Sequence, residues 1–296
     1  MSFEDRAFCG WRIRSALPLP ELPVWSGSPN APVDVAIEPG RVAPASERDP
    51  WLKIEADGAV RMCLPGTVRL LIENGRRITV DVVGTEKAPA WRLFLLGLGM
   101  AILCHQRGVV PLHAASLAVA GRTVTLLGAS GAGKSTLAFA LLRRGHTLLS
   151  DDLTVLAPGR PQVLPAFARL RLWRDSLDGM GVSAAGLARS RDALEKFDFE
   201  PDHDFDTTPR PLGAVFLLKT GVAPALERVT PAAAVPLVSS HVARAGVGRA
   251  LGRRAEMFAA AAGVARAAPM YRLVRSVDFA HLDETVRLVE AAALAA

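Results

Sequence analysis

Gly128-Ala-Ser-Gly-Ala-Gly-Lys-Ser135 is the stretch of sequence that decides the fold. It satisfies the pattern G-x-x-x-x-G-K-[ST], whose glycines let the backbone approach phosphate groups closely. A β-prone run over residues 123–127 precedes it, and a helical run over residues 135–144 follows it. Because this loop requires a strand before it and a helix after it, the stretch predicts a phosphate-binding loop, or P-loop.

The residues of this loop predict a site for a nucleoside triphosphate and Mg²⁺. Backbone N–H groups of the loop and of the helix N-terminus form a cradle for anions. Lys134 reaches the outer phosphates, and the Ser135 hydroxyl can ligate Mg²⁺. The expected nucleotide-binding residues are Gly128, Ala129, Ser130, Gly131, Ala132, Gly133, Lys134, Ser135 and Thr136. The motif does not identify the acceptor of a phosphoryl group.

Asp151 and Asp152 follow a short apolar strand predicted over residues 147–149. The order strand, loop, helix, strand is typical of a parallel βαβ unit, whose right-handed crossover brings both strand ends to the same edge of the sheet. We therefore expect the two carboxylates beside the loop. One can hold Mg²⁺ and the other can accept a proton from an attacking hydroxyl. The alternative is that either aspartate only caps a turn.

His113 lies in an apolar strand predicted over residues 109–119, just before the strand of the P-loop. A single histidine in such a strand is usually structural, with its ring satisfied by a backbone carbonyl. The residue pattern alone leaves the role of His113 open.

The rest of the chain predicts two domains. Residues 1–88 read as a small, mainly-β domain, which we expect to dock or orient a substrate. Its clearest signal is a hairpin over residues 68–82, because Asn74-Gly75 separates two β-prone runs. After a boundary at Ala88-Pro89, an apolar helix over residues 90–107 opens the P-loop domain of residues 89–296. Further strands are expected over residues 169–173, 212–218 and 271–274, and helices over residues 253–268 and from residue 282.

Composition excludes several classes of protein. With 296 residues, half of them hydrophobic, the chain can bury a large core and is not disordered. Three scattered cysteines disfavour a disulfide framework and suit the cytoplasm. We expect no membrane segment, because the apolar run of residues 93–104 is too short. The net charge of +6 comes without a nucleic-acid-reading motif, so we expect no nucleic-acid partner.

The segment of residues 112–156 resembles the catalytic core of HPr kinase/phosphorylase. A His-bearing strand, the P-loop, the pair Gly145-His146 and the pair Asp151-Asp152 follow in that family's order and at similar spacing. The resemblance implies an α/β fold: a P-loop kinase core like the C-terminal domain of HPr kinase and akin to phosphoenolpyruvate carboxykinase, preceded by the small mainly-β domain. It also implies an enzyme that uses ATP and Mg²⁺ to phosphorylate a serine.

Residues 15–23 and 169–176 are similar to segments of smaller HPr-kinase-related proteins in peptide-tailoring pathways. These include kinases that phosphorylate a C-terminal serine of lasso peptide precursors. This resemblance implies a peptide or small-protein substrate that carries a serine, and it leaves a homo-oligomer open. Thr136 stands where the HPr enzyme generally has Glu, which argues against phosphorylase activity and against HPr as the substrate.

Carried over to this chain, the resemblance makes Asp151 the general base and places His113 near the transferred phosphoryl group. Asp152 becomes a metal ligand together with Ser135, although the roles of the two aspartates could be exchanged. Two other functions stay open: a P-loop protein in which the nucleotide only switches conformation, and a kinase that acts on a small molecule.

Charged segments elsewhere offer weaker candidates. The arginines Arg244, Arg249, Arg253 and Arg254 could supply an arginine finger or form a solvated helix face. Arg169 and Arg171 are expected to point outward, as surface residues or peptide contacts. The acidic stretch of residues 198–206 reads as a solvated loop rather than a metal site.

Overall fold

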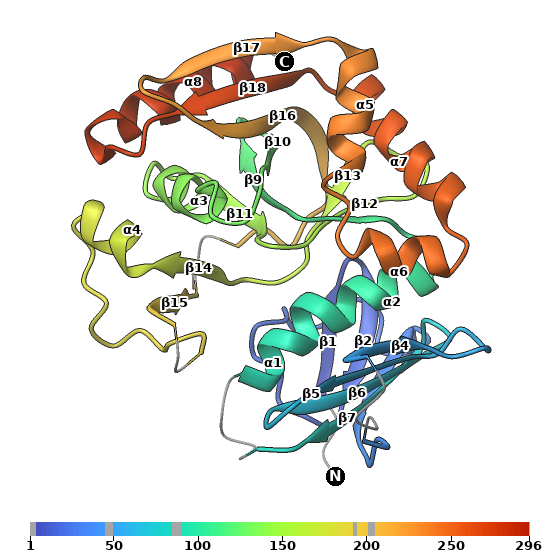
Figure 1. Ribbon diagram of the computed structural model, residues 1–296. Coiled ribbons are helices and arrows are strands. Elements are labelled where there is room, and N and C mark those ends of the chain that lie inside the picture. The colour runs from blue at the N-terminus through green and yellow to red at the C-terminus, as the bar shows by residue number, and fades with distance from the viewer. Residues whose placement is uncertain (1–3, 45–49, 85–89, 192–193, 201–204, 296) are drawn as a thin grey trace. The chain divides into compact units, whose positions relative to one another are not determined.

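The computed structural model describes residues 4–44, 50–84, 90–191, 194–200 and 205–295. They form two compact units, each of which is described by itself (Figure 1). The first unit comprises Met1–Val110 and Arg244–Glu256, and the second comprises Pro111–Ala243 and Met257–Ala296. The chain is therefore a mixed α/β protein with several sheets, as the sequence predicts at this coarser level.

The first unit is built on one sheet with the strand order β1-β2-β3-β7-β6-β5-β4. Its strands are β1 (Glu4–Phe8), β2 (Trp11–Ser15), β3 (Val35–Pro39), β4 (Leu52–Ile54), β5 (Val60–Leu64), β6 (Val68–Glu73) and β7 (Arg77–Val82). The predicted hairpin is confirmed: β6 and β7 pair antiparallel, and both Asn74 and Gly75 have positive φ in the turn. Positive φ at two central residues is the geometry that Asn-Gly favours.

The predicted helix over residues 90–107 also belongs to this unit. It consists of α1 (Ala90–Phe94), a π-helical turn η1 (Leu95–Gly99) and α2 (Met100–Gln106). The Gln106 side chain donates to Ile72 O at 2.8 Å and accepts from Gly75 N at 2.9 Å, which ties the helix to the hairpin. The short helix α6 (Ala245–Ala250) lies in the same unit.

The compact units divide at Val110, because the helical segment groups with the sheet. The predicted boundary at Ala88-Pro89 lies outside the described residues. A docking role for residues 1–88, and residues 89–296 as the domain that contains the P-loop, stay predictions.

The second unit has a central set of strands in the order β11-β9-β10-β16-β18-β17. Three further strands, β8, β12 and β13, join it through the start of β16. The strands are β8 (Pro111–Leu112), β9 (Ala114–Val119), β10 (Arg122–Leu127), β11 (Thr147–Ser150), β12 (Thr154–Leu156), β13 (Gln162–Leu164), β16 (Arg210–Thr220), β17 (Ala225–Val229) and β18 (Met270–Arg275). A separate ribbon consists of β14 (Leu170–Trp173) and β15 (Lys196–Phe199).

The helices of this unit complete the fold. They are α3 (Lys134–Leu142), α4 (Arg174–Gly179), α5 (Pro231–Ser239), α7 (Arg254–Ala267), the 3₁₀ turn η2 (Phe279–His281) and α8 (Leu282–Leu294). Helix α7 begins in the last residues grouped with the first unit.

The prediction of a simple βαβ unit around the P-loop needs a correction. Strand β9 lies between β10 and β11 and pairs antiparallel with both. Because β9 is antiparallel to each, β10 and β11 still run in the same direction. Their carboxyl ends therefore meet at one edge of the sheet, as expected.

The single strand predicted over residues 109–119 is also interrupted. Leu112 on β8 pairs with Thr154, whereas Ala114 on β9 pairs with Leu127 at the end of β10. His113 lies between these two strands, and its backbone N donates to His241 O at 2.7 Å. This change of partner places His113 beside the end of β10.

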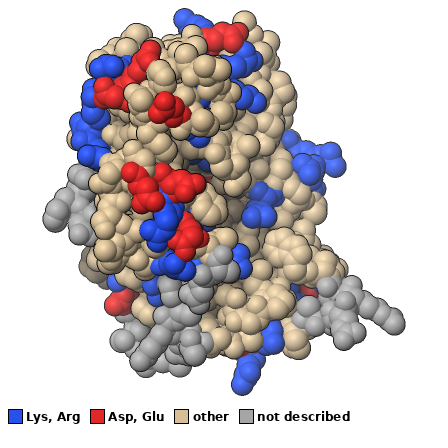
Figure 2. Space-filling model, turned by 60° about the vertical axis from the view of Figure 1, so that its left-hand side comes forward, with Lys and Arg blue, Asp and Glu red and all other residues tan. Residues whose placement is uncertain are grey.

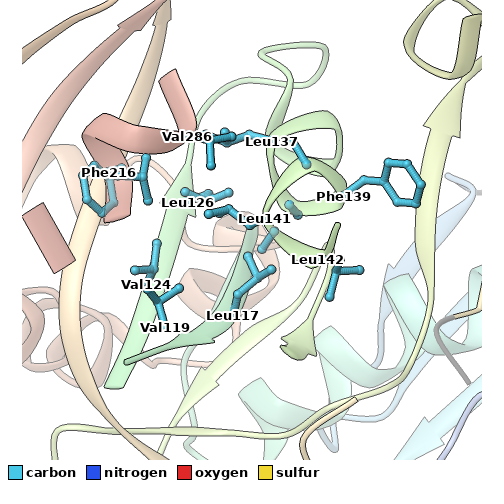
Figure 3. Close-up of a cluster of buried hydrophobic side chains, with 14 of the residues drawn as sticks. Leu117, Val119, Val124, Leu126, Leu137, Phe139, Leu141, Leu142, Phe216 and Val286 are labelled. Atoms are coloured by element: carbon cyan, nitrogen blue, oxygen red, sulfur yellow. The ribbon is translucent and has the colours of Figure 1, made fainter. Parts of the chain in front are cut away.

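Helix α3 is buried on two sides. On one side Leu137 and Leu141 join a cluster with side chains of β9, β10, β16 and α8 (Figure 3). On the other side the ring of Phe139 packs edge to face against Phe199 of β15, with 4.9 Å between centroids. The helix that follows the P-loop is thus held between the sheet and the β14–β15 ribbon.

Many charged side chains form ion pairs where the structure describes them. On the face in Figure 2, basic and acidic groups lie next to one another rather than in one continuous basic area. Glu195 pairs with both Arg174 and Arg189 at 2.5 Å. Among the helices of the described part of the chain, none has the length and apolar character needed to cross a bilayer.

Truncation of Leu126 to alanine tests the core beneath the P-loop. Leu126 is fully buried on β10, so Leu126→Ala should lower the free energy of unfolding by about 2–5 kcal/mol in urea titrations. The control is Val222→Ala, since Val222 is 91% exposed and should change stability by less than about 0.5 kcal/mol. Equal effects of the two variants would contradict this description of the core.

Candidate active site

The P-loop follows β10 and leads into α3, so the predicted context of strand, loop and helix is present. Gly131 and Gly133 have φ of 80° and 89°, in the left-handed region that glycine adopts most easily. A Cβ at Gly133 would lie 2.5 Å from the guanidinium of Arg275, so a side chain here would have to displace that group. Gly133 caps α3, and the N–H groups of the first turn of a helix have no partner within the helix.

Lys134 is buried at the start of α3 and is bonded to its own loop. Its ammonium donates to Gly128 O at 2.8 Å and to Ala129 O at 3.2 Å, and it lies 3.2 Å from His113 Nε2. Burial lowers the pKa of Lys134, while the charge of Asp151 acts in the opposite direction. The position matches a point charge for the outer phosphates of a nucleotide.

The two aspartates after β11 lie beside the loop, in different environments. Ser135 Oγ donates to the Asp151 carboxylate, with distances of 3.0 and 3.2 Å to its two oxygens. Asp151 is only 1% exposed and also accepts from Arg171 N at 3.3 Å. Asp152 has a positive φ, is half-buried and forms an ion pair with the side chain of Arg171. The structure thus joins Ser135 to Asp151, whereas the family resemblance paired it with Asp152.

His113 connects Lys134 to the second aspartate. Its Nδ1 lies 3.2 Å from the backbone oxygen of Asp152, and its Nε2 lies 3.2 Å from Lys134 Nζ. Burial, and then the charge of Lys134, lower the pKa of His113 to about 4. The ring is therefore neutral near pH 7. Its partners assign the proton to Nδ1, which donates to the carbonyl, while Nε2 accepts from Lys134.

A pocket of about 330 Å³ opens over the loop. P-loop residues, His113 and Asp152 line it, together with cations from three other strands: Arg171 on β14, Lys196 on β15 and Arg275 at the end of β18. Burial, and then the charge of Arg171, lower the pKa of Lys196 to about 8. This concentration of positive charge suits a polyanionic ligand.

Several sequence expectations for the cations are wrong or incomplete. Arg171 lines the pocket, and Arg169 is 3% exposed rather than on the surface. Lys196 and Arg275 were missed, because no motif near them signals phosphate. Both lie on strands far from the P-loop in sequence, Lys196 in the β14–β15 ribbon and Arg275 in the sheet, and only tertiary packing brings them close.

Among the described residues that line this pocket, none comes from the other charged segments. The candidate finger arginines Arg244, Arg249, Arg253 and Arg254 belong to the first compact unit, whereas the P-loop belongs to the second. Within the first unit, Arg253 pairs with Glu256. Residues 201–204 of the acidic stretch lie outside the described part, and the described residues contain no group of three or more His, Cys, Asp or Glu placed to hold a metal.

Oxygen ligands for a hard cation are nevertheless present at the loop. Ser135 Oγ and the carboxylate of Asp151 lie within hydrogen-bond distance of each other, beside the pocket. Mg²⁺ usually takes one or two carboxylates and completes its shell with phosphate oxygens and water, so it does not need a cage of three protein acids. The donor set therefore fits Mg²⁺ with a bound polyphosphate.

Comparisons with known proteins agree with the resemblance in part. No protein-family model matches the chain. A protein named HPr kinase/phosphorylase from Chloroherpeton thalassium is 32% identical over 117 residues, which is 36% of this chain and 33% of that protein. The chain thus spans about a third of that relative's length. A structure of the Hpr(Ser) kinase/phosphatase from Coxiella burnetii overlaps 62% of this chain and 97% of its own, at 13% identity and a TM-score of 0.29. Over the segment matched in sequence, this chain is HPr kinase-like.

Proposed function

We propose that the chain is an ATP- and Mg²⁺-dependent kinase that transfers the γ-phosphoryl group to a serine hydroxyl of a peptide or small protein. The observation that carries this proposal is the convergence of Lys134, Ser135 and the acid pair at one edge of one sheet, around a cationic pocket. The fold we propose for this unit is a P-loop kinase core akin to that of HPr kinase.

The chemistry of the pocket supports a nucleoside triphosphate as the donor. The cradle of residues 128–136 supplies backbone N–H groups, and Lys134, Arg171, Lys196 and Arg275 supply positive charge. Mg²⁺ bound together with the nucleotide would neutralise charge on the phosphates. Most of the rate enhancement is then expected from positioning and electrostatic stabilisation.

The proposed phosphoryl transfer is a single displacement at the γ-phosphorus. The serine oxygen forms a bond to the γ-phosphorus, the bond from that phosphorus to the bridging oxygen breaks, and ADP leaves. The proton of the serine hydroxyl passes to a carboxylate. Lys134 neutralises the charge of the transferred phosphoryl group. Neutral His113 contacts both the Lys134 ammonium and the backbone carbonyl of Asp152, and so fixes their relative positions.

The contacts favour the exchanged roles for the two aspartates. Asp151 is buried and bonded to Ser135, so we assign it to Mg²⁺ together with Ser135. Asp152 lines the pocket, so we assign it as the base that faces the acceptor hydroxyl. Its ion pair with Arg171 holds the carboxylate at the pocket.

A lasso-peptide precursor with a terminal serine is the acceptor class that the sequence resemblance suggests. The similarity to a protein named HPr kinase/phosphorylase supports kinase chemistry.

Mass spectrometry tests the proposed activity directly. The full chain is incubated with ATP, Mg²⁺ and a library of short peptides, half ending in serine and half in alanine at the same position. We expect some serine peptides to gain one phosphate and the matched alanine peptides to gain none. Release of ADP with no peptide modified would contradict the kinase and favour a nucleotide switch.

Replacement of the two aspartates separates their roles. With a peptide identified in that screen, Asp152→Asn should lower kcat by about a hundredfold or more, since it removes the base, while nucleotide affinity stays near normal. Asp151→Asn should instead raise the Mg²⁺ concentration that gives half-maximal rate. Glu227→Gln is the control, because Glu227 is exposed and pairs with Arg272 on β18. A normal kcat for Asp152→Asn would show that the base is assigned wrongly.

The pKa of His113 predicts how stability depends on pH. Between its ordinary value of 6.5 and its folded value of about 4, the unfolded chain binds a proton at His113 that the folded chain does not. Stability from this residue is therefore complete above pH 6.5 and is lost as the pH falls. On going from pH 7 to pH 5, the wild type should lose about 1–2 kcal/mol more than His113→Gln in urea titrations. Identical pH dependence of the two proteins would contradict a neutral His113.

A further inference from the structure

The order of strands in the sheet places chemically different residues on the two sides of the P-loop. β9, which begins after His113, and β11, which ends before the acid pair, lie on one side of β10, whereas β16 and β18 lie on the other. Lys134 reaches toward His113, so the outer phosphates belong on the β9 side. If the triphosphate follows the loop, its nucleoside end leaves on the β18 side.

The segment after β18 offers apolar surface at that place. Val277 and Phe279 line the same pocket as the P-loop, and Val277 is 67% exposed. Arg275 precedes them and donates from Nε to Ala132 O at 2.6 Å, so the segment is fastened to the loop itself. These two apolar residues, of which Val277 is exposed and Phe279 half-buried, have no role in the phosphoryl transfer described above.

Local hydrogen bonds hold this segment in one conformation. Asp278 N donates to Ser276 Oγ at 3.1 Å, and Ala280 N donates to Asp278 Oδ1 at 2.9 Å. The Phe279 ring lies against Gly179 at the end of α4, where a Cβ would come within 2.4 Å of it. The ring is thus held in place before any ligand binds, which reduces the entropy lost on binding.

Helix α4 connects this ring to the loop. Thr136 Oγ1 on α3 lies 2.9 Å from Ser176 Oγ on α4, and both line the pocket. The Phe279 ring therefore packs against the same short helix that Thr136, the residue after the P-loop motif, contacts. Because the ring and the cradle line one pocket, one nucleotide can contact both.

We propose that Phe279 and Val277 form the subsite for the nucleobase of the phosphoryl donor, with the base stacked on the Phe279 ring. This rests on the proposed function and adds to it the residues that bind the base of the nucleotide. Stacking of a base on an aromatic ring is tolerant of base identity, because every base presents a π face.

Trp173 is another aromatic residue that lines the pocket, and it is exposed. It ends β14, pairs with Lys196 on β15 and has the Lys196 ammonium 5.4 Å from its ring. Arg171 on the same strand contacts Asp152. Trp173 thus lies on the strand whose Arg171 contacts Asp152, the residue assigned to the acceptor hydroxyl. We therefore assign the nucleobase to Phe279 rather than to Trp173.

Calorimetric titration of the full chain separates the base from the phosphates. The two probes are the Mg²⁺ complexes of a non-hydrolysable ATP analogue and of inorganic tripolyphosphate. Wild type should bind the nucleotide about tenfold or more tightly than tripolyphosphate. Phe279→Ala should weaken nucleotide binding about tenfold and leave tripolyphosphate binding unchanged, while Phe279→Trp should restore nucleotide binding. The control is Phe258→Ala, because Phe258 is 65% exposed and does not line the pocket.

The other outcomes overturn the proposal in distinguishable ways. Equal affinity of the wild type for both probes would exclude a base subsite while keeping the P-loop as a phosphate site. Loss of nucleotide affinity in Trp173→Ala but not in Phe279→Ala would assign the base to Trp173 instead. If Phe279→Ala weakened the binding of both probes equally, the ring would only maintain the shape of the pocket and would not bind the base. Binding of neither probe to the wild type would contradict the proposed function itself.

Discussion

The hydrogen bond from Ser135 Oγ to the buried carboxylate of Asp151 is the contact on which the site depends. It joins the first turn of α3 to the residue that follows β11, although β9 separates β10 from β11 in the sheet. A buried carboxylate is costly unless it is hydrogen-bonded, and here a hydroxyl and the Arg171 N–H satisfy it. The loop and the acid pair are therefore held at one edge before any ligand arrives.

Much of this could be predicted from sequence, because the signals are local. The glycines of the P-loop, the strand before it and the helix after it follow from residues adjacent in the chain. The Asn74-Gly75 turn is equally local, since it needs two residues that accept positive φ. The placement of Asp151 beside the P-loop could be predicted from strand direction alone, because two strands that run in the same direction end at the same edge of the sheet.

The remainder depends on tertiary pairing, which no local pattern encodes. The insertion of β9 between β10 and β11, and the break at His113, arise because β8 and β9 find different partners. The cations Lys196 and Arg275 arrive at the pocket from strands distant in sequence, so nothing in their neighbours marks them. Arg171 lies on β14 and lines the pocket, whereas Arg169 lies just before that strand and is buried.

The structure of the chain in complex with Mg²⁺ and a non-hydrolysable ATP analogue tests the central claim most directly. The account predicts phosphates along the backbone of residues 128–136, with the terminal one in contact with Lys134. The metal should touch Ser135 and Asp151, and Asp152 should face the open end of the terminal phosphate. A nucleotide bound elsewhere, or a metal held by neither Ser135 nor the acid pair, would contradict it.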